Sequence, residues 1–519
     1  MITASDAFHA EAIGQVINPV ARYYISFDKE TSADTTYFTL NQSALNGSDI
    51  LTTSDDNPIQ LWDTYDYKDY SDRLVKVEWS RSIEFPYTVQ SAIADVTLNN
   101  YDGYFTPNSD STISDDNLPK RPARIYAGYS TNGVVPQLVG LTQEMPSIDD
   151  NNRIATYHMM DFLSEIAEQN LNSVVAMQNA RTDQVLAMIV TQFGVLPSQY
   201  NFDKGANAIP FVFFDKNTNA GEAIRKLVQA EIGRMWLDEM GMLRFQSRVN
   251  VPSEPVMVLD NYSVISIKPS TSSQMVNHVK VTADIREVQE WQSVYTKVSS
   301  GDSVSSDLWV VPAGSSYTWE ASLIDPCYDI QAPTIGKNSA VSWFTARTSN
   351  GEEITSGVTC SGELSTNAYS MTFTNNNLVP VEIDEIELWG EPAKVVDVID
   401  YDAYEDESLA KYGDNLLEVT DNQFIQSYSQ AEAFAKYLLY QYAFYNGVLE
   451  LEVKGDVALQ IGDVVSIQTT QFTGTYMVDS LAYNLQPGLL ATRMTVHKFT
   501  AIPFFVLDSS VLNGDDLLG

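Results

Sequence analysis

The side chains that most often do chemistry in proteins are few in this sequence and far apart. The four histidines are His9, His158, His278 and His497. No two of them have the spacing that ligands of one zinc ion need, and no HExxH motif is present. The two cysteines, Cys327 and Cys360, have no histidine beside them in sequence, so neither is expected to be an activated nucleophile. The pair either forms a disulfide or consists of two free thiols made in a reducing cytoplasm.

Carboxylates are the opposite case, because they are too numerous to mark a site. Any two of the 68 Asp and Glu residues could be proposed as the acid and the nucleophile of a glycosidase. Asp102 in a Tyr-Asp-Gly turn and Glu231 in a helix are expected to be structural. The acidic segments 63–66 and 110–116 lack the calcium-loop spacing with its central glycine, so we expect solvated loops there.

Phosphate-binding and nucleophile motifs are also missing. The sequence has no Walker A loop, no GxGxxG and no GxSxG. We therefore predict that the protein is not an enzyme and has no catalytic residue, no metal site and no cofactor.

The charge balance excludes two further classes of function. The 519 residues include 30 Lys and Arg against 68 Asp and Glu, which gives a net charge of −38. Gripping nucleic acid or docking on anionic lipid requires clustered basic residues. Composition does not indicate disorder, since 44% of the residues are hydrophobic and 11% are aromatic. We find no apolar stretch of membrane-spanning length and no signal-peptide pattern, and therefore expect a soluble protein.

The elements that must position any site are mostly strands. Alternating apolar residues predict strands at 73–79, 91–100, 124–129, 138–141 and 153–159, which together suggest a β-sandwich or barrel over 71–178. Helices are expected at 182–193 and from Asn219 to a stop at Gly233, followed by a hairpin over 235–246. These form a small α/β module at 179–250.

The second half of the chain returns to strands around an inserted unit. Strands are expected in 256–283 and 448–499, and a helix is expected to begin at the capping-box pair Ser429 and Glu432. The acidic segment 392–412 reads as a solvated loop. Residues 291–392 suggest an inserted β-sandwich whose aromatic residues either fill its core or stack on sugars. Those aromatic residues are Trp309, Tyr317, Trp319, Trp343, Phe344, Phe373 and Trp389.

One short repeat joins the two ends of the chain. Residues 38–51 read FTLNQSALNGSDIL and residues 505–518 read FVLDSSVLNGDDLL. The segments are either two similar turns or one docking segment used twice, which would add avidity. The candidate partner-docking residues are Phe38, Leu40, Ser43, Leu45, Phe505, Leu507, Ser510 and Leu512.

An ordered series of motifs resembles the baseplate-hub, or minor tail, proteins of long-tailed bacteriophages. Residues 94–107 (ADVTLNNYDGYFTP) are similar to a family signature of the type Leu-x-Asn-x-Asp-Gly-x-Phe-x-Pro. Further similar stretches follow in the same order along the chain. They are 119–128 (PKRPARIYAG), 139–142 (VGLT), 181–185 (RTDQV), 233–248 (GRMWLDEMGMLRFQSR), 459–465 (LQIGDVV), 474–478 (GTYMV) and 505–512 (FVLDSSVL).

The resemblance implies a fold and an assembly. Hub proteins of this kind are usually homotrimers in which each subunit contributes two β domains of tail-tube type. The fold class is then mainly β with a small α/β module, an α+β multidomain chain with two tube-like barrel or sandwich domains and an inserted β-sandwich. The tube-like domains would be 71–178 and 251–290 plus 393–500. Residues 1–70 would be an N-terminal extension, 291–392 the insert and 501–519 a C-terminal tail.

The resemblance also implies partners and a place of action. The trimer would join the hexameric tail tube, or distal tail proteins, to tip or fibre proteins, and would contact the host surface indirectly. It would be assembled in the host cytoplasm and act at the virion tail tip. Genome DNA would pass through without specific binding, and a channel wall rich in Asp and Glu would repel its phosphates. Simple solubility is the rival explanation of the charge.

Two other functions stay open at this point. The first is a receptor- or glycan-binding tail-tip protein that uses the aromatic residues of the insert. The second is a cell-wall glycan hydrolase, although no peptidase or lysozyme-like domain is recognised.

The terminal repeat generates a testable prediction. Deletion of residues 505–518 should weaken assembly with another tail protein, because one of two docking segments is lost. Co-sedimentation of the deletion variant with tail components measures this. Unchanged assembly together with unchanged infectivity would contradict the docking interpretation.

Overall fold

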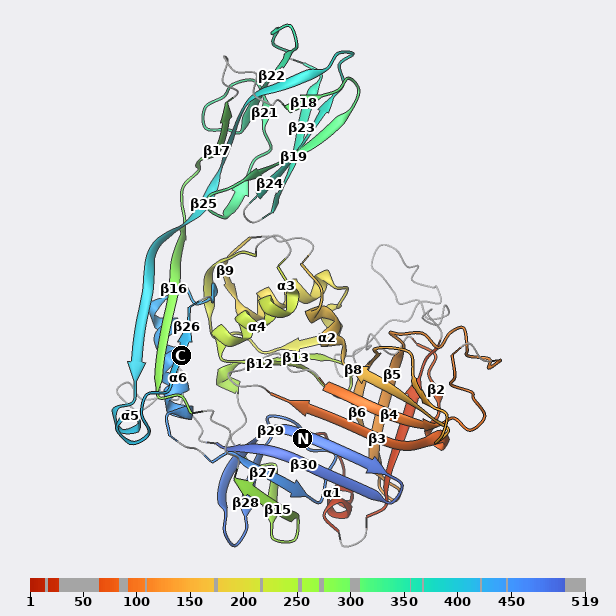
Figure 1. Cartoon of the computed structure of the whole chain (residues 1–519). Coiled ribbons are helices and arrows are strands. Elements are labelled where there is room, and N and C mark those ends of the chain that lie inside the picture. The colour runs from red at the N-terminus through yellow and green to blue at the C-terminus, as the bar shows by residue number, and fades with distance from the viewer. Residues whose placement is uncertain are drawn as a thin grey trace, which may run out of the picture.

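Strands are the main secondary structure in this computed structural model. It describes residues 1–14, 17–27, 65–83, 92–107, 110–171, 176–214, 218–250, 254–269, 275–298, 309–354, 356–365, 368–420, 422–444 and 447–499. Figure 1 shows a β-rich body with a small helical module, from which an elongated β unit projects. The predicted mainly β multidomain fold with a small α/β module is confirmed. No helix within these ranges has the length and apolar character needed to cross a membrane.

A single fourteen-stranded sheet forms the body and combines strands from both ends of the chain. Its main path runs β15-β27-β30-β29-β3-β4-β8-β6-β5-β1-β2, with β7, β14 and β28 attached to the side. The N-terminal strands are β1 (Pro19–Ile25), β2 (Lys68–Asp69), β3 (Leu74–Ser82), β4 (Ala92–Asn99), β5 (Pro122–Tyr129), β6 (Gly133–Thr142), β7 (Ser147–Asp149) and β8 (Ile154–Met160). The C-terminal strands are β14 (Met257–Asp260), β15 (Val264–Pro269), β27 (Leu449–Val453), β28 (Val464–Gln468), β29 (Thr473–Gln486) and β30 (Leu489–Lys498).

Alternation of apolar and polar residues explains why these segments are strands. In β4, the side chains of Ala92, Ala94, Val96 and Leu98 are buried, whereas the residues between them are exposed or half-buried. Successive side chains of a strand point to opposite faces, so this pattern gives the sheet one core face and one solvent face. The short helix α1 (Asp6–Ala12) covers part of the core, with Phe8 packed against the ring of Tyr129 at 4.9 Å between centroids.

The helical module follows the first set of strands, as predicted. It contains α2 (Phe162–Ala167), α3 (Thr182–Gln192) and α4 (Ala220–Glu231), a mixed sheet of β10 (Tyr200–Phe202), β13 (Leu243–Gln246) and β12 (Arg234–Leu237), and the pair β9 (Met177–Arg181) and β11 (Ala208–Val212). The predicted N-cap is confirmed, since the Asn219 side chain accepts a hydrogen bond from the Glu222 backbone at 2.9 Å.

The end of α4 differs from the prediction in its last residue. The chain turns at Ile232, which adopts the left-handed conformation with φ of 57°, and not at Gly233. Gly233 serves another purpose, because a Cβ there would lie 2.7 Å from the Gln246 carbonyl of the neighbouring hairpin. Glycine is therefore required by the close approach of two backbones.

The predicted start of the C-terminal helix is wrong by two residues. Helix α6 (Tyr428–Tyr442) is capped by Ser427, whose hydroxyl accepts from the Gln430 backbone at 3.2 Å. The Gln430 side chain in turn accepts from the backbone of Gln426 at 2.8 Å. Ser429 and Glu432 therefore lie inside the helix, and their spacing does not mark its start.

The acidic segment 392–412 is not a solvated loop, contrary to the prediction. It belongs to the long strand β25 (Val381–Tyr404) and to helix α5 (Asp406–Tyr412). Strand β16 (His278–Val288) pairs with β25 on one side and with β26 (Leu416–Val419) on the other. Ile399 is buried while Asp400 and Asp402 are both exposed, so these acidic residues occupy the solvent side of a strand with one buried side.

The strands of the predicted second tube-like domain are divided between two sheets. The domain boundaries stay a prediction, but hydrogen bonds join only β14, β15 and β27–β30 of the second tube-like segment to the large sheet. Strands β16 and β26 and helix α6 share a hydrophobic core with α3 and α4 instead. The segment 393–404 of β25 lies on the same core through Ile399.

The insert is a β-sandwich carried away from the body by the β16–β25 ribbon (Figure 1). One layer consists of β17 (Gln292–Val298), β18 (Trp309–Val311), β20 (Cys327–Ile330), β21 (Thr334–Ile335) and β22 (Trp343–Thr348) around β25, and the other of β19 (Ser316–Ser322), β24 (Ala368–Asn375) and β23 (Val358–Ser365). Most of the aromatic residues fill its core. Phe344 and Phe373 are buried, and the stacked rings of Trp309 and Trp319 lie 4.8 Å apart.

The two cysteines of the insert are free thiols in the structure. Burial raises the pKa of Cys327 and of Cys360 to about 12. Neither side chain therefore supplies a thiolate at neutral pH.

A histidine at the root of the ribbon generates a prediction about pH. His278 Nε2 lies 2.7 Å from Asp402 and Nδ1 lies 3.0 Å from Asp414, and the ring of Tyr404 stands edge-on beside it. Carboxylates only accept, so both contacts are satisfied when the imidazole is protonated and donates twice. Partial burial lowers the pKa of His278, but the two hydrogen-bonded carboxylates outweigh it and the net shift is upward.

We predict that His278→Gln loses stability mainly at acid pH. A raised folded pKa gives stability that is fully present below the unfolded value near about 6.5 and is lost as pH rises through the folded pKa. The difference in unfolding free energy from the wild type should be about 1 kcal/mol at low pH and shrink above it. Urea denaturation from pH 5 to 8 measures this, with Lys280→Gln on the same strand as a pH-independent control. A flat difference for both variants would contradict the prediction.

Candidate functional site

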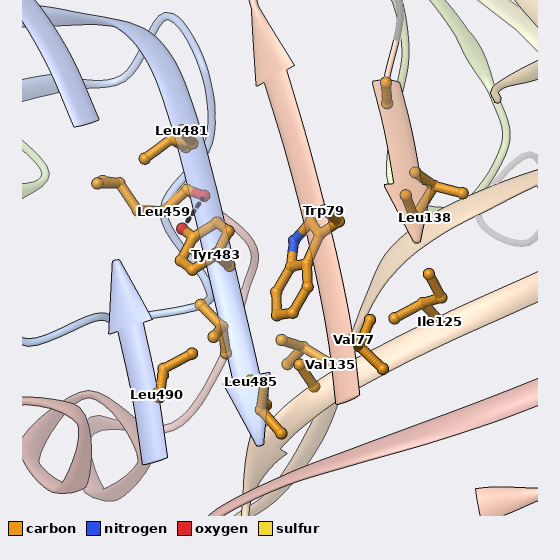
Figure 2. Packing of buried hydrophobic residues seen from close by; sticks show 14 of the residues in the cluster. Val77, Trp79, Ile125, Val135, Leu138, Leu459, Leu481, Tyr483, Leu485 and Leu490 are labelled. Atoms are coloured by element: carbon orange, nitrogen blue, oxygen red, sulfur yellow. Dashed lines mark hydrogen bonds between the residues drawn. The ribbon is translucent and has the colours of Figure 1, made fainter. Parts of the chain in front are cut away.

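The two halves of the chain meet where strand β3 pairs antiparallel with strand β29. Tyr483 lies opposite Trp79 in this register, and their rings stack at 4.8 Å between centroids (Figure 2). The Trp79 indole donates to the Gln137 side chain at 3.2 Å, and the Gln137 amide donates to the Val457 carbonyl at 2.8 Å. These contacts bind residues of β3, β6 and the C-terminal half into one buried group, which we call the β3–β29 junction.

A buried ion pair brings the helical module to the same junction. The Arg81 guanidinium donates to the Glu239 carboxylate and to the Gln137 carbonyl, and the Gln460 amide donates to the other oxygen of Glu239. Arg81 and Glu239 side chains are each only 8% exposed. The first β region, the turn between β12 and β13, and the C-terminal half are therefore joined by one charged hydrogen-bond network.

Tyrosine hydroxyls complete the junction. The Tyr483 hydroxyl donates to the Asp456 carbonyl at 3.2 Å, and the Tyr129 hydroxyl donates to the Gly455 carbonyl at 2.5 Å. Burial raises the pKa of Tyr483 far above its usual value and that of Tyr129 in the same direction. Both hydroxyls therefore stay protonated and can donate to the backbone carbonyls.

The solvent face of the large sheet lies directly over this junction. We call it the outer sheet face and define it by the outward-pointing residues of β15, β27, β30, β29, β3 and β4. A shallow hollow of about 330 Å³ lies at its centre. Its lining includes the small side chains Ser80, Ala482 and Ala491 between the longer Glu78, Asp95, Asn484 and Arg493.

Charges on the outer sheet face are compensated in pairs. The outward-pointing lysines and arginines are Lys76, Lys268 and Arg493. Each contacts a carboxylate: Lys76 contacts Glu78 at 2.6 Å, Lys268 contacts Glu450 at 3.5 Å, and Arg493 contacts Glu452 at 3.1 Å. Each outward-pointing lysine or arginine in the described part of these strands thus has an acidic neighbour. Lys498, exposed at the end of β30, lies in the register of that strand's buried residues and is not part of this face.

All four histidines lie against aspartates, which the sequence did not indicate. His158 Nδ1 is 2.5 Å from Asp95, His9 Nδ1 is 2.6 Å from Asp456, and His497 Nδ1 is 2.7 Å from Asp479. Together with the His278 contacts these are small groups in separate places, not one cluster. Among the described residues, no three His, Cys, Asp or Glu side chains gather in a way that could hold a metal ion.

The two carboxylates singled out from the sequence are structural in different ways. The Asp102 carboxylate accepts one hydrogen bond from each of two guanidinium nitrogens of Arg73, both at 2.8 Å. This contact lowers the pKa of Asp102 to about 2. Glu231 is fully buried and accepts from Thr182, Ser247 and the backbone of residues 206 and 207. Its ion pair with buried Arg248 makes it the polar centre of the helical module, not a helix-face residue.

The predicted docking residues cannot be assigned a place. Phe38, Leu40, Ser43, Leu45, Phe505, Leu507, Ser510 and Leu512 all lie outside the described residues. Their role in binding partners stays a prediction.

Comparison with known proteins gives similar structures but no matching sequence family. No family model and no curated protein matches the chain. A 43 kDa tail protein of prophage MuSo2 from Shewanella oneidensis aligns with 83% of this chain and 96% of its own, at 10% identity and a TM-score of 0.47. A tail protein from Neisseria meningitidis aligns with 83% and 94% at 8% identity and a TM-score of 0.46. The prophage tail protein gp18 from Listeria monocytogenes aligns with 84% and 93% at 11% identity and a TM-score of 0.40.

These similar structures are tail proteins, the class that the sequence motifs resemble.

The junction residues could hardly be found from sequence. Arg81 and Glu239 are 158 positions apart, and Gln137 lies in a strand that reads only as apolar. One usable signal exists, since Trp79 and Arg81 fall on the inward positions of a strand whose outward positions are polar. An inward arginine requires a buried acidic partner.

A double-mutant cycle tests this network. We predict that Arg81→Met destabilises the protein by about 3–5 kcal/mol, because Glu239 is left buried without its partner. The double variant Arg81→Met with Glu239→Gln should lose less than the sum of the two single variants. Chemical denaturation measures each value. Arg73→Met, which breaks the exposed pair with Asp102, serves as a control and should cost about 1 kcal/mol or less. Additive losses would show that the two side chains are not coupled.

Proposed function

We propose that this protein is a structural component of a viral tail, a hub that joins the hexameric tail tube to the trimeric tip and lines the channel for DNA. The order of its family-like motifs supports this role, as does the continuous sheet built from both halves of the chain. The role requires a rigid wall and no catalysis. We place the protein at the virion tail tip after assembly in the host cytoplasm.

The observation that carries the proposal is the pairing of charges on the outer sheet face. DNA binds proteins chiefly by exchanging its counterions for lysine and arginine side chains. Lys76, Lys268 and Arg493 already contact carboxylates, so a phosphate that approaches them must compete with Glu78, Glu450 and Glu452. A wall of this kind lets DNA slide past without being held.

The open ends of the large sheet support a ring of subunits. Strand β15 at one end pairs only with β27, and β2 at the other end pairs only with β1, within the described residues. An unpaired strand edge presents backbone groups with which a strand of another chain can pair, unless the edge is short or charged as β2 is. In the proposed homotrimer, three copies would place six β regions around one axis and match the six-fold symmetry of a tube.

Charge reversal on this face generates the test. Glu450→Lys with Glu452→Lys removes the partners of Lys268 and Arg493 and adds two cations. We predict that the double variant retards duplex DNA in a gel at low salt, whereas the wild type does not. Retention should fall steeply as the salt concentration rises. The slope of the logarithm of the binding constant against the logarithm of salt concentration should steepen by about one for each additional phosphate that the protein binds.

A matched control separates location from total charge. Asp397→Lys with Asp400→Lys makes the same change in charge at exposed positions of the β25 ribbon. If both double variants retain DNA equally, the outer sheet face has no special relation to DNA and the channel proposal fails. Light scattering and low-resolution imaging of the wild type must also give a three-fold particle with a central hole, and a stable monomer would refute the hub.

A further inference from the structure

The far end of the insert carries a small group of exposed apolar side chains. Three turns meet there, because Val381 at the start of β25 lies beside both Val311 of β18 and Thr348 of β22. The turns cover residues 312–315, 349–352 and 376–380. Figure 1 shows this end of the sandwich as the part of the molecule farthest from the body.

Leu378, in the turn before β25, is almost completely accessible to solvent. The side chain of Leu378 is 97% exposed, that of Val379 is 47% exposed, and that of Val310 is 41% exposed. Exposed residues that extend the same apolar surface are Pro312, Ala313 and Pro380. We call these six residues the apolar tip. Grouped exposed apolar residues are typical of binding surfaces, whereas single ones are ordinary.

A buried asparagine holds the apolar tip in one conformation. The Asn375 amide donates to the carbonyls of Val311 at 3.1 Å, Pro312 at 3.2 Å and Val379 at 2.8 Å. Its carbonyl oxygen accepts from the Asn377 backbone at 2.9 Å. One side chain thereby fixes two turns against each other, so little conformational entropy remains to be lost when the tip binds.

The surroundings of the apolar tip are acidic. Glu352 and Glu353 are exposed beside it, and Glu382 follows it in β25. The segments 309–315, 348–353 and 375–382 contain no lysine or arginine. The nearest arginine, Arg347, already contacts Glu382 at 3.5 Å and Asp384 at 3.4 Å. The ammonium of Lys297 lies 3.9 Å from the ring centroid of Trp309. An anionic membrane would repel this surface, whereas a protein pocket with basic residues at its rim would attract it.

We propose that the apolar tip docks into an apolar pocket with a basic rim on a second protein, and that Leu378 is the side chain that enters the pocket. This goes beyond the proposed hub function, which concerns the body. The insert would act as a rigid arm that presents one preformed contact at a distance from the channel.

Site-specific photo-crosslinking in assembled particles tests the proposal. Benzoylphenylalanine is placed at position 378 of the full chain, and at position 324 as a matched control. Ile324 is 95% exposed and lies in the same insert, in the loop before β20. We expect one crosslinked protein from position 378, with lysine or arginine near the linked peptide, and none from position 324. Crosslinks to a second copy of this chain, to lipid, or equally from both positions would overturn the proposal.

Charge substitution gives a second measurement on the same two positions. Leu378→Asp should weaken binding to the crosslinked protein by about 30-fold, as expected for a side chain at the centre of an interface. Ile324→Asp should leave binding unchanged. Both side chains are exposed, so neither change should affect folding, which circular dichroism checks. Equal binding by the two variants would overturn the proposal. If the chain is absent from the particles altogether, the hub function fails instead.

Discussion

The packing of Trp79 on Tyr483, in the register that pairs β3 with β29, is the contact on which the body of this protein depends. Some 400 residues separate the two strands in sequence, counted as 483 − 79 = 404. Closing a loop of that length costs conformational entropy, and the cost must be offset by contacts made at the closure itself. A stacked aromatic pair, a strand-to-strand ladder and the buried Arg81–Glu239 network supply those contacts together. Without them the hydrogen-bonded ladder that makes one continuous sheet of the two halves would be lost.

Scarcity of basic residues explains how charge is used throughout the molecule. With 30 Lys and Arg against 68 Asp and Glu, any basic side chain has an excess of acidic partners available. Arg81 and Arg248 are buried and hold parts of the chain together through Glu239 and Glu231. Lys76 and Arg493 lie on the surface and contact Glu78 and Glu452. The same excess of acid therefore supports buried networks and leaves the outer sheet face, within the described strands, without uncompensated cations.

The ribbon of β16 and β25 separates two kinds of surface. The body offers a broad sheet face with paired charges, as the proposed channel wall requires. The insert offers a compact apolar tip whose two turns are fixed by Asn375, which suits a contact that must bind. A two-stranded ribbon alone would be weak, but Val279, Val281 and Ile399 are buried against the helical module and anchor its lower part.

Local elements were determined by the sequence, whereas their partners were decided by the tertiary structure. Alternation in β4, the cap at Asn219 and the hairpin of β12 and β13 were predictable because each depends on residues within a few positions. The pairing of β3 with β29 was not, since a strand's pattern shows which face is buried but not which strand lies beside it. For the same reason the acidic segment 392–412 was predicted to be a loop, because its sequence does not show that part of it pairs with β16. The candidate docking repeats came from sequence alone, and the junction and the apolar tip became visible only when distant segments were brought together in space.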